Sequence, residues 1–121
     1  MKREILFRGK RMDNDKWEVG FLSWSDSPRK RSYHINNHVV YTETVGQFTG
    51  LIDKNGTKIF EGDIVKFYDD LEDEFANGII VCNADFCSFC VSMKGHEDIM
   101  LMAHWQYEVI GNVHDNKELI K

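Results

Sequence analysis

Short segments in which apolar and polar residues alternate, separated by Gly, Asn and Asp, recur along most of this 121-residue chain. Alternation with a period of two places successive side chains on opposite faces and is typical of half-buried strands. Ile5 and Phe7 show it first, and Val65 and Phe67 show it again near the middle of the chain. Because the segments are short and evenly spaced, they predict a mainly β fold built as a small antiparallel barrel or roll. The sequence "HDNKELI" predicts a short helical turn at the C-terminus.

Two glycine turns lie close together in the stretch "GLIDKNGTKIFEGDIVKF", residues 50–67. Asn55-Gly56 supplies residues that tolerate a positive φ, as tight turns require. At Gly62-Asp63 the chain is expected to turn again before it enters the strand "DIVKFY". We therefore interpret both glycines as corners between consecutive strands.

The same stretch also suggests a calcium loop, because Asp53, Asn55 and Thr57 stand at alternate positions. An EF-hand requires Gly at its sixth position and Glu at its twelfth. Those positions hold Lys58 and Ile64, so the pattern favours a turn over a calcium site.

Charge is distributed unevenly along the chain. Residues 1–60 carry 11 Lys or Arg and 7 Asp or Glu, a net charge of +4, whereas residues 61–121 carry 4 and 13, a net charge of −9. The total of −5 argues against a protein that coats nucleic acid, whose affinity would rest on many basic contacts to phosphate. The acidic run "DDLEDE" is expected to be a solvated face.

The compact basic run of the chain lies in "SDSPRKRSYH", which we expect to be a polar loop. Arg29, Lys30 and Arg31, with the aromatic residues Trp24 and Tyr33 nearby, form a possible interaction surface. Such a surface could grip phosphate and stack a base, as proteins that bind single strands do. Three basic residues are few for that purpose, so nucleic-acid binding is the weaker interpretation.

Cys82, Cys87 and Cys90 have the spacing of three of the four ligands in plant-type [2Fe–2S] ferredoxins. The fourth cysteine is missing, although His96 or His104 could complete a zinc site. The pattern "FCSFCV" is typical of a strand, which would direct its two thiols to opposite faces and would not provide the helix N-terminus of a redox CxxC motif. We therefore expect all three cysteines to be small buried packing residues.

Three blocks of the sequence resemble one protein family. "QFTGLIDKNGTKIFEGDIVKF" resembles the signature "tGL.DknGk.IyeGDiv" of the YopX family of bacteriophage and prophage proteins. "REILFRGKRMDNDKW" is similar to the family's opening "kFRaw", and "YEVIGNVHDNKEL" is similar to its closing "eviGNiyenpeL". The resemblance implies an N-terminal β-strand region followed by a C-terminal SH3-like small barrel that begins near Gly62-Asp63. We accordingly expect an N-terminal lobe over residues 1–60 and a barrel lobe over residues 61–121.

These observations favour a non-enzymatic protein-interaction module that self-associates as a homo-oligomer. The alternative is a nucleic-acid accessory protein that uses the basic loop around residues 29–31. The resemblance brings no catalytic residues, and we assign no catalytic, cofactor-binding or metal-ligating residue. Apolar segments fall far short of the roughly 20 residues that span a bilayer, so we expect no membrane contact. An odd number of clustered cysteines fits the reducing cytoplasm of a bacterial host.

Overall fold

The computed structural model describes residues 4–102 and 106–120, and its regular elements are almost all β-strands. The strands are, in chain order, β1 (Phe7–Lys10), β2 (Trp17–Gly20), β3 (Leu22–Asp26), β4 (Arg31–Ile35), β5 (His38–Val40), β6 (Gly46–Ile52), β7 (Lys58–Phe60), β8 (Asp63–Asp69), β9 (Glu74–Asn83), β10 (Ser88–Ser92), β11 (Ile99–Met100) and β12 (Glu108–Asn112). Among the described residues, the 3-10 turns η1 (Thr42–Thr44) and η3 (Lys117–Ile120) accompany them. The mainly β fold and the helical turn near the C-terminus are confirmed. No helix in this part of the chain is long and apolar enough to cross a membrane.

The chain divides into two compact units, residues 1–50 (unit 1) and residues 51–121 (unit 2). The boundary between the units lies within β6, whereas the boundary expected from the sequence lay after residue 60. Antiparallel pairing links β1 to both β2 and β6, and β6 is in turn a neighbour of β7 in the same sheet. The strands β3, β4 and β5 form a separate antiparallel sheet in unit 1.

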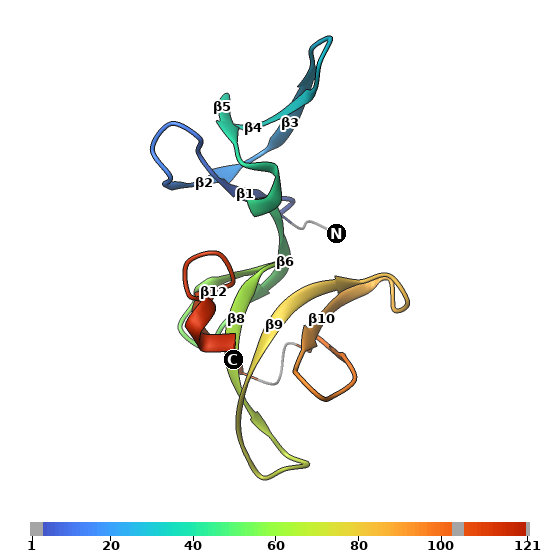
Figure 1. The fold of residues 1–121 in the computed structure, drawn as a ribbon. Coiled ribbons are helices and arrows are strands. Elements are labelled where there is room, and N and C mark those ends of the chain that lie inside the picture. Colours follow the sequence, from blue (N-terminus) through green and yellow to red (C-terminus); the bar gives the residue numbers. More distant parts are fainter. Residues whose placement is uncertain (1–3, 103–105, 121) are drawn as a thin grey trace. The chain divides into compact units, whose positions relative to one another are not determined.

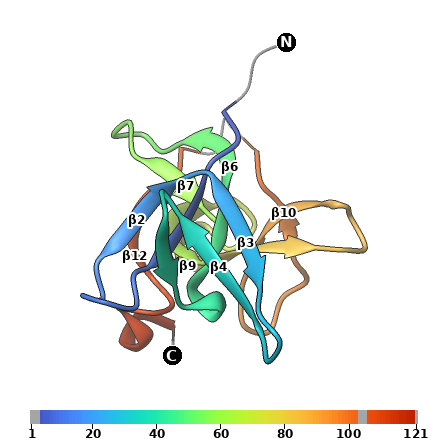
Figure 2. The same ribbon diagram turned by 90° about the horizontal axis from the view of Figure 1, so that it is seen from above.

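The segment that was expected to be a polar loop is instead a β-hairpin of unit 1. Arg31–Ile35 forms β4 and pairs with β3, so that only residues 27–30 form the connection. Ser27 and Lys30 close this connection, since the Ser27 backbone N–H donates to the Lys30 carbonyl at 3.0 Å and the Ser27 hydroxyl donates to the same carbonyl at 2.8 Å. Figures 1 and 2 show β3 and β4 side by side as a ribbon whose turn points away from the rest of unit 1.

The sheet of unit 2 has the strand order β11-β10-β9-β8-β12, with antiparallel pairing throughout. Figure 1 shows its long strands β8 and β9 curled along their length. Val65 and Phe67 point into the core and are 0% and 1% exposed, which confirms the alternation seen in the sequence. The ring of Phe67 meets the ring of Tyr107 edge to face, with centroids 5.7 Å apart. The core of unit 2 is made of Ile59, Val65, Phe67, Ile80, Val91, Met93 and Tyr107.

Both glycines of the signature segment are corners, as predicted. Gly56 has a φ of +85° and Gly62 has a φ of +92°, which are conformations that side-chain-bearing residues rarely adopt. The Gly62 N–H donates to the Ile80 carbonyl at 2.8 Å, and the Gly62 carbonyl accepts from the Val113 N–H at 2.9 Å. These two hydrogen bonds connect the second corner, just before β8, to β9 and to the residue that follows β12.

Asn77-Gly78 is a dipeptide typical of turns, but it forms no turn here, because both residues lie within β9. The chain reverses earlier, at residues 70–73, and β8 and β9 pair directly from Asp69 and Glu74 onwards. Gly78 is buried against the next strand, where a Cβ atom would lie 2.3 Å from a methyl carbon of Val91. This glycine thus permits close packing of strands and does not form a turn.

Candidate functional site

The β3–β4 hairpin brings together all five residues that the sequence suggested as an interaction surface. Trp24 and Tyr33 are cross-strand partners, and Arg31 begins β4 opposite Asp26. Arg29 and Lys30 are exposed on the connection, so the basic and aromatic side chains belong to one hairpin. We call Trp24, Arg29, Lys30, Arg31 and Tyr33 the basic hairpin surface.

Within the basic hairpin surface, Arg31 is held in place while Trp24 stays accessible. The guanidinium carbon of Arg31 lies 4.0 Å from the centre of the Trp24 ring, a cation–π contact. Its Nε also donates to the Asp26 carboxylate at 2.9 Å. Hydrogen bonds to Asp26 and then to Tyr33 raise the pKa of Arg31 above its usual value. Trp24 is nevertheless 55% exposed, so its ring can contact a partner.

A depression of about 160 Å³ lies beside this hairpin in unit 1. Lys30 and Arg31 contribute positive charge to its lining, and Met12 and Val39 contribute apolar surface. Met12 is 46% exposed and Val39 is 40% exposed. Glu43 is also part of the lining, so one side of the depression is acidic. We call it the β5 depression, because Val39 and Val40 of β5 are part of its lining.

The turn between β8 and β9 presents the opposite chemistry, and Figure 1 places it at the far end of a long hairpin of unit 2. Residues 69–74, "DDLEDE", which we call the acidic tip, contain five carboxylates and Leu71. The Leu71 side chain is 94% exposed. Asp69 shapes the turn, since its Oδ1 accepts from the backbone N–H of Leu71 at 3.0 Å. The solvated acidic face expected from the sequence thus carries an apolar residue at its end.

Two aromatic side chains support the acidic tip from the strands beneath it. Tyr68 and Phe75 are cross-strand partners whose rings meet edge to face at 5.4 Å, and the Lys66 ammonium lies 4.9 Å from the Phe75 ring. The Tyr68 hydroxyl donates to the Asp73 carboxylate. Leu71 and Phe75 were not among the functional candidates expected from the sequence. The signal was present, because "DDLEDEF" interrupts an acidic run with large apolar residues.

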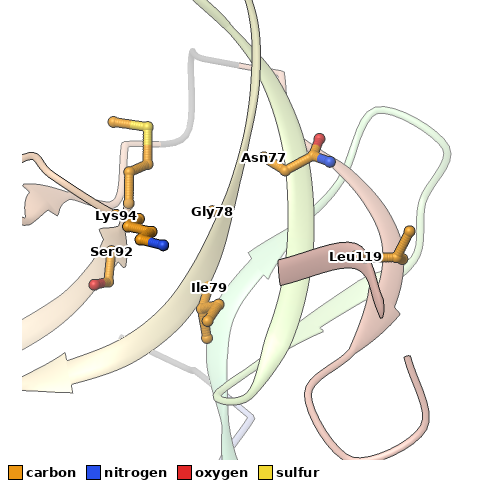
Figure 3. A pocket seen from close by; sticks show the side chains of 7 residues that line it. Asn77, Gly78, Ile79, Ser92, Lys94 and Leu119 are labelled. Carbon is orange, nitrogen blue, oxygen red and sulfur yellow. The ribbon is translucent and has the colours of Figure 1, made fainter. Parts of the chain in front are cut away.

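Unit 2 also has a groove of about 500 Å³ between β9, the end of β10 and η3. Figure 3 shows Ser92 and Lys94 on one side, Leu119 on the η3 side, and Gly78 and Ile79 between them. Its lining includes one ionisable side chain, that of Lys94, and one hydroxyl, that of Ser92. The groove therefore offers a single positive charge beside the apolar side chains of Ile79, Met93 and Leu119.

Asp53 of the signature segment has a structural role that its calcium-like spacing conceals. Its Oδ1 accepts from the backbone N–H groups of Asn55 at 2.8 Å and Thr57 at 2.9 Å. Its Oδ2 accepts from the N–H of Val109 at 2.9 Å. Burial raises the pKa of Asp53, but the three N–H donors outweigh burial and hold its pKa below the usual value. Through these bonds the carboxylate connects the turn at Gly56 to β12. Both of its oxygens accept hydrogen bonds from backbone N–H groups.

Asp63 of the same segment performs a similar task at the second corner. It is 1% exposed, and its Oδ2 accepts from the backbone N–H of Phe60 at 2.7 Å. Both aspartates of the signature therefore fix backbone turns around Gly56 and Gly62. The glycines and aspartates of the signature segment thus have a structural role, which is to form and fix two turns.

The three cysteines do not share one environment. Cys90 is buried, as expected, and burial raises the pKa of its thiol. Cys82 and Cys87 are exposed, so their predicted burial is wrong. Cys87 lies in the turn before β10 with a φ of +49°, where the sequence pattern had indicated a strand. Within residues 4–102 and 106–120, no three His, Cys, Asp or Glu side chains gather as metal ligands would. His104 lies outside the described residues.

Comparison with known proteins identifies a matching family and a similar solved structure. The profile of the family described as YopX protein matches residues 6–121. The crystal structure of protein EF1440 from Enterococcus faecalis is similar to this chain with a TM-score of 0.60 at 21% sequence identity. The similarity covers 99% of this chain and 100% of that chain, and it shows a shared fold. No curated protein gives a significant match.

Proposed function

The chain belongs to the YopX family, and from this premise we propose that it is a non-enzymatic protein-interaction module that self-associates. We place it in the cytoplasm of a bacterial host that carries a phage or prophage. One observation carries the proposal: the basic hairpin surface and the acidic tip of residues 69–74 are exposed ends of two different β-hairpins. The glycine corners and their aspartates stabilise the fold. The two hairpin ends, in contrast, offer complementary contact surfaces.

Charge complementarity of this kind acts most effectively between chains. Exposed ion pairs within one chain contribute only about 0 to 1 kcal/mol each. Between chains, opposite patches orient the encounter and select the partner. Because the two surfaces differ, one copy would offer its basic surface and the next its acidic tip. Such a head-to-tail contact closes into a ring where the rotation permits and otherwise extends. We therefore expect a homo-oligomer in which opposite charges orient neighbouring copies.

Light scattering of the purified protein at low and high salt tests this proposal. We expect a mass several times the monomer mass of 14.2 kDa in about 50 mM salt, falling towards the monomer near 0.5 M as charges are screened. The double change Arg29→Glu and Lys30→Glu should lower the mass at low salt without unfolding the chain. Arg31 is left unchanged because it packs on Trp24.

The control carries the same charge change elsewhere on the surface, at Lys16→Glu and Lys94→Glu, which are exposed. This control should keep the mass of the unmodified protein. If the unmodified protein is a monomer at low salt and high concentration, self-association is refuted.

A second candidate function, a nucleic-acid accessory role, is favoured by the exposure of Trp24 beside basic residues. Stacking of a base on an aromatic ring and contacts from Arg and Lys to phosphate are the usual means of single-strand binding. One face of the Trp24 ring is already covered by Arg31, so a base would need the other face or would have to displace the guanidinium. Fluorescence anisotropy with a labelled single-stranded oligonucleotide distinguishes the two roles. Binding that weakens steeply with salt and is lost in Trp24→Ala would support this role.

A further inference from the structure

Leu71 is unusual among the exposed apolar residues because a defined turn keeps its side chain almost fully exposed to solvent. Single exposed hydrophobic side chains are common on protein surfaces and need no explanation by themselves. Leu71, however, is 94% exposed at the end of a hairpin whose turn is fixed by a hydrogen bond to the Asp69 carboxylate. Carboxylates precede and follow it, at Asp70 and Glu72. The acidic tip thus presents one apolar side chain between negative charges.

The β5 depression presents the complementary arrangement. Its exposed apolar surface comes from Met12 and Val39, and its positive charge comes from Lys30 and Arg31 on the hairpin side. An apolar side chain that entered it would bring flanking carboxylates towards those cations. Glu43 in the lining would repel an acidic segment on its own side and so restrict how the segment can enter. The depression therefore offers apolar surface for Leu71 and two basic side chains for the carboxylates beside it.

We propose that Leu71 of one copy inserts into the β5 depression of a second copy, with Asp70 and Glu72 facing Lys30 and Arg31. This inference rests on the proposed self-association and names the contact that would carry it. Apolar burial supplies affinity that salt does not screen, while the charges supply orientation. Since burial of a leucine side chain is the main apolar gain, we expect Leu71→Ala to weaken association about tenfold to a hundredfold.

Mixing two blocked variants tests the contact directly. Leu71→Asp removes the apolar tip and leaves the depression intact, whereas Met12→Glu blocks the depression and leaves the tip intact. Both residues lie in turns and are exposed, so both variants should fold. Each variant alone should be a monomer. An equimolar mixture should form a dimer of twice 14.2 kDa and nothing larger, because one good tip meets one good depression.

Phe86→Asp is the matched control, because Phe86 is a 48% exposed apolar residue in the turn between β9 and β10. It should keep the oligomer mass of the unmodified protein. Circular dichroism of each variant checks the fold, and a variant that had unfolded could not complement its partner.

The possible outcomes separate this inference from the proposed function. If the unmodified protein oligomerises but Leu71→Asp and Met12→Glu keep its mass, the Leu71 contact is refuted and self-association stands. If both variants are monomers and their mixture stays monomeric, the tip and the depression are not partners, which also refutes the contact. A monomeric unmodified protein refutes both. A dimer that appears only in the mixture supports the contact.

Discussion

Replacing Asp53 by Ala should destabilise unit 2 more than any exposed substitution, because one carboxylate satisfies three backbone donors. The Val109 N–H lies in a half-buried strand, and its loss of a charged acceptor costs about 2 to 3 kcal/mol. The Asn55 and Thr57 N–H groups belong to exposed residues that water can reach, so each costs roughly 0.5 kcal/mol. We therefore expect a total loss of about 3 to 4 kcal/mol in the free energy of unfolding.

Urea titration followed by circular dichroism measures this loss, and calorimetry gives the melting temperature. For a chain of this length, 1 kcal/mol corresponds to about 4 °C, so we expect a decrease of more than about 10 °C. The stability of Asp53→Asn should lie between those of the unmodified protein and Asp53→Ala. The asparagine keeps one acceptor oxygen but directs an amide N–H at a backbone donor. Asp85→Ala removes an exposed turn carboxylate and is the matched control, expected to stay within about 0.5 kcal/mol.

The pH dependence of the same variants supplies a second check. The pKa of Asp53 is lowered in the folded protein, so its stabilisation is fully present above the ordinary aspartate pKa of about 4. That stabilisation is lost as the pH falls through the lowered pKa of the folded protein. The difference between Asp53→Ala and the unmodified protein should therefore shrink in acid. A loss below about 1 kcal/mol at neutral pH, or a difference that grows in acid, would refute the three-donor account.

Three further predictions concern the corner, the close strand packing and the thiols. Gly56→Val should lower the free energy of unfolding by about 1 to 2 kcal/mol and Gly56→Asn by much less, because Asn tolerates a positive φ; equal effects in thermal melts would contradict the turn. Gly78→Ala should destabilise by about 1 to 3 kcal/mol in urea titration, because its Cβ would lie 2.3 Å from a side chain of the next strand; an unchanged midpoint would contradict that contact. Cys82 and Cys87 should react rapidly with a thiol reagent in the native protein, whereas Cys90 should react only on unfolding, which counting of modified thiols by mass spectrometry can check.

Residues whose role is local could be assigned from the sequence. Asn55-Gly56 and Gly62-Asp63 were expected to be corners, because a positive φ is a property of a residue and its nearest neighbours. The alternation of Val65 and Phe67 with Lys66 and Tyr68 likewise predicted which side of β8 faces the core. These predictions succeeded because the period of a strand is fixed by backbone geometry.

The sequence also placed the candidate residues of the basic hairpin surface, although their secondary structure was mistaken. "SDSPRKRSYH" has the composition of a loop, yet Arg31 to Ile35 pairs with β3. Strand pairing depends on a partner elsewhere in the chain, so a polar segment can form a strand when a neighbouring strand aligns with it. That alignment is what brings Arg31 onto Trp24.

Contacts between distant residues required the tertiary structure. The pattern around Asp53 showed a turn, but the bond from Val109, 56 residues away in the sequence, is a product of the fold. Gly78 resembled a turn residue and proved to be a point of close packing, since the chain had already reversed at residues 70–73. Burial of a thiol likewise depends on which strand covers it, so Cys90 is buried while Cys82 is exposed. The sequence by itself determined the core-facing side of β8 and the corners at Gly56 and Gly62, because local backbone geometry fixes them. Only the tertiary structure decided which side chains meet, because packing brings together residues that are distant along the chain.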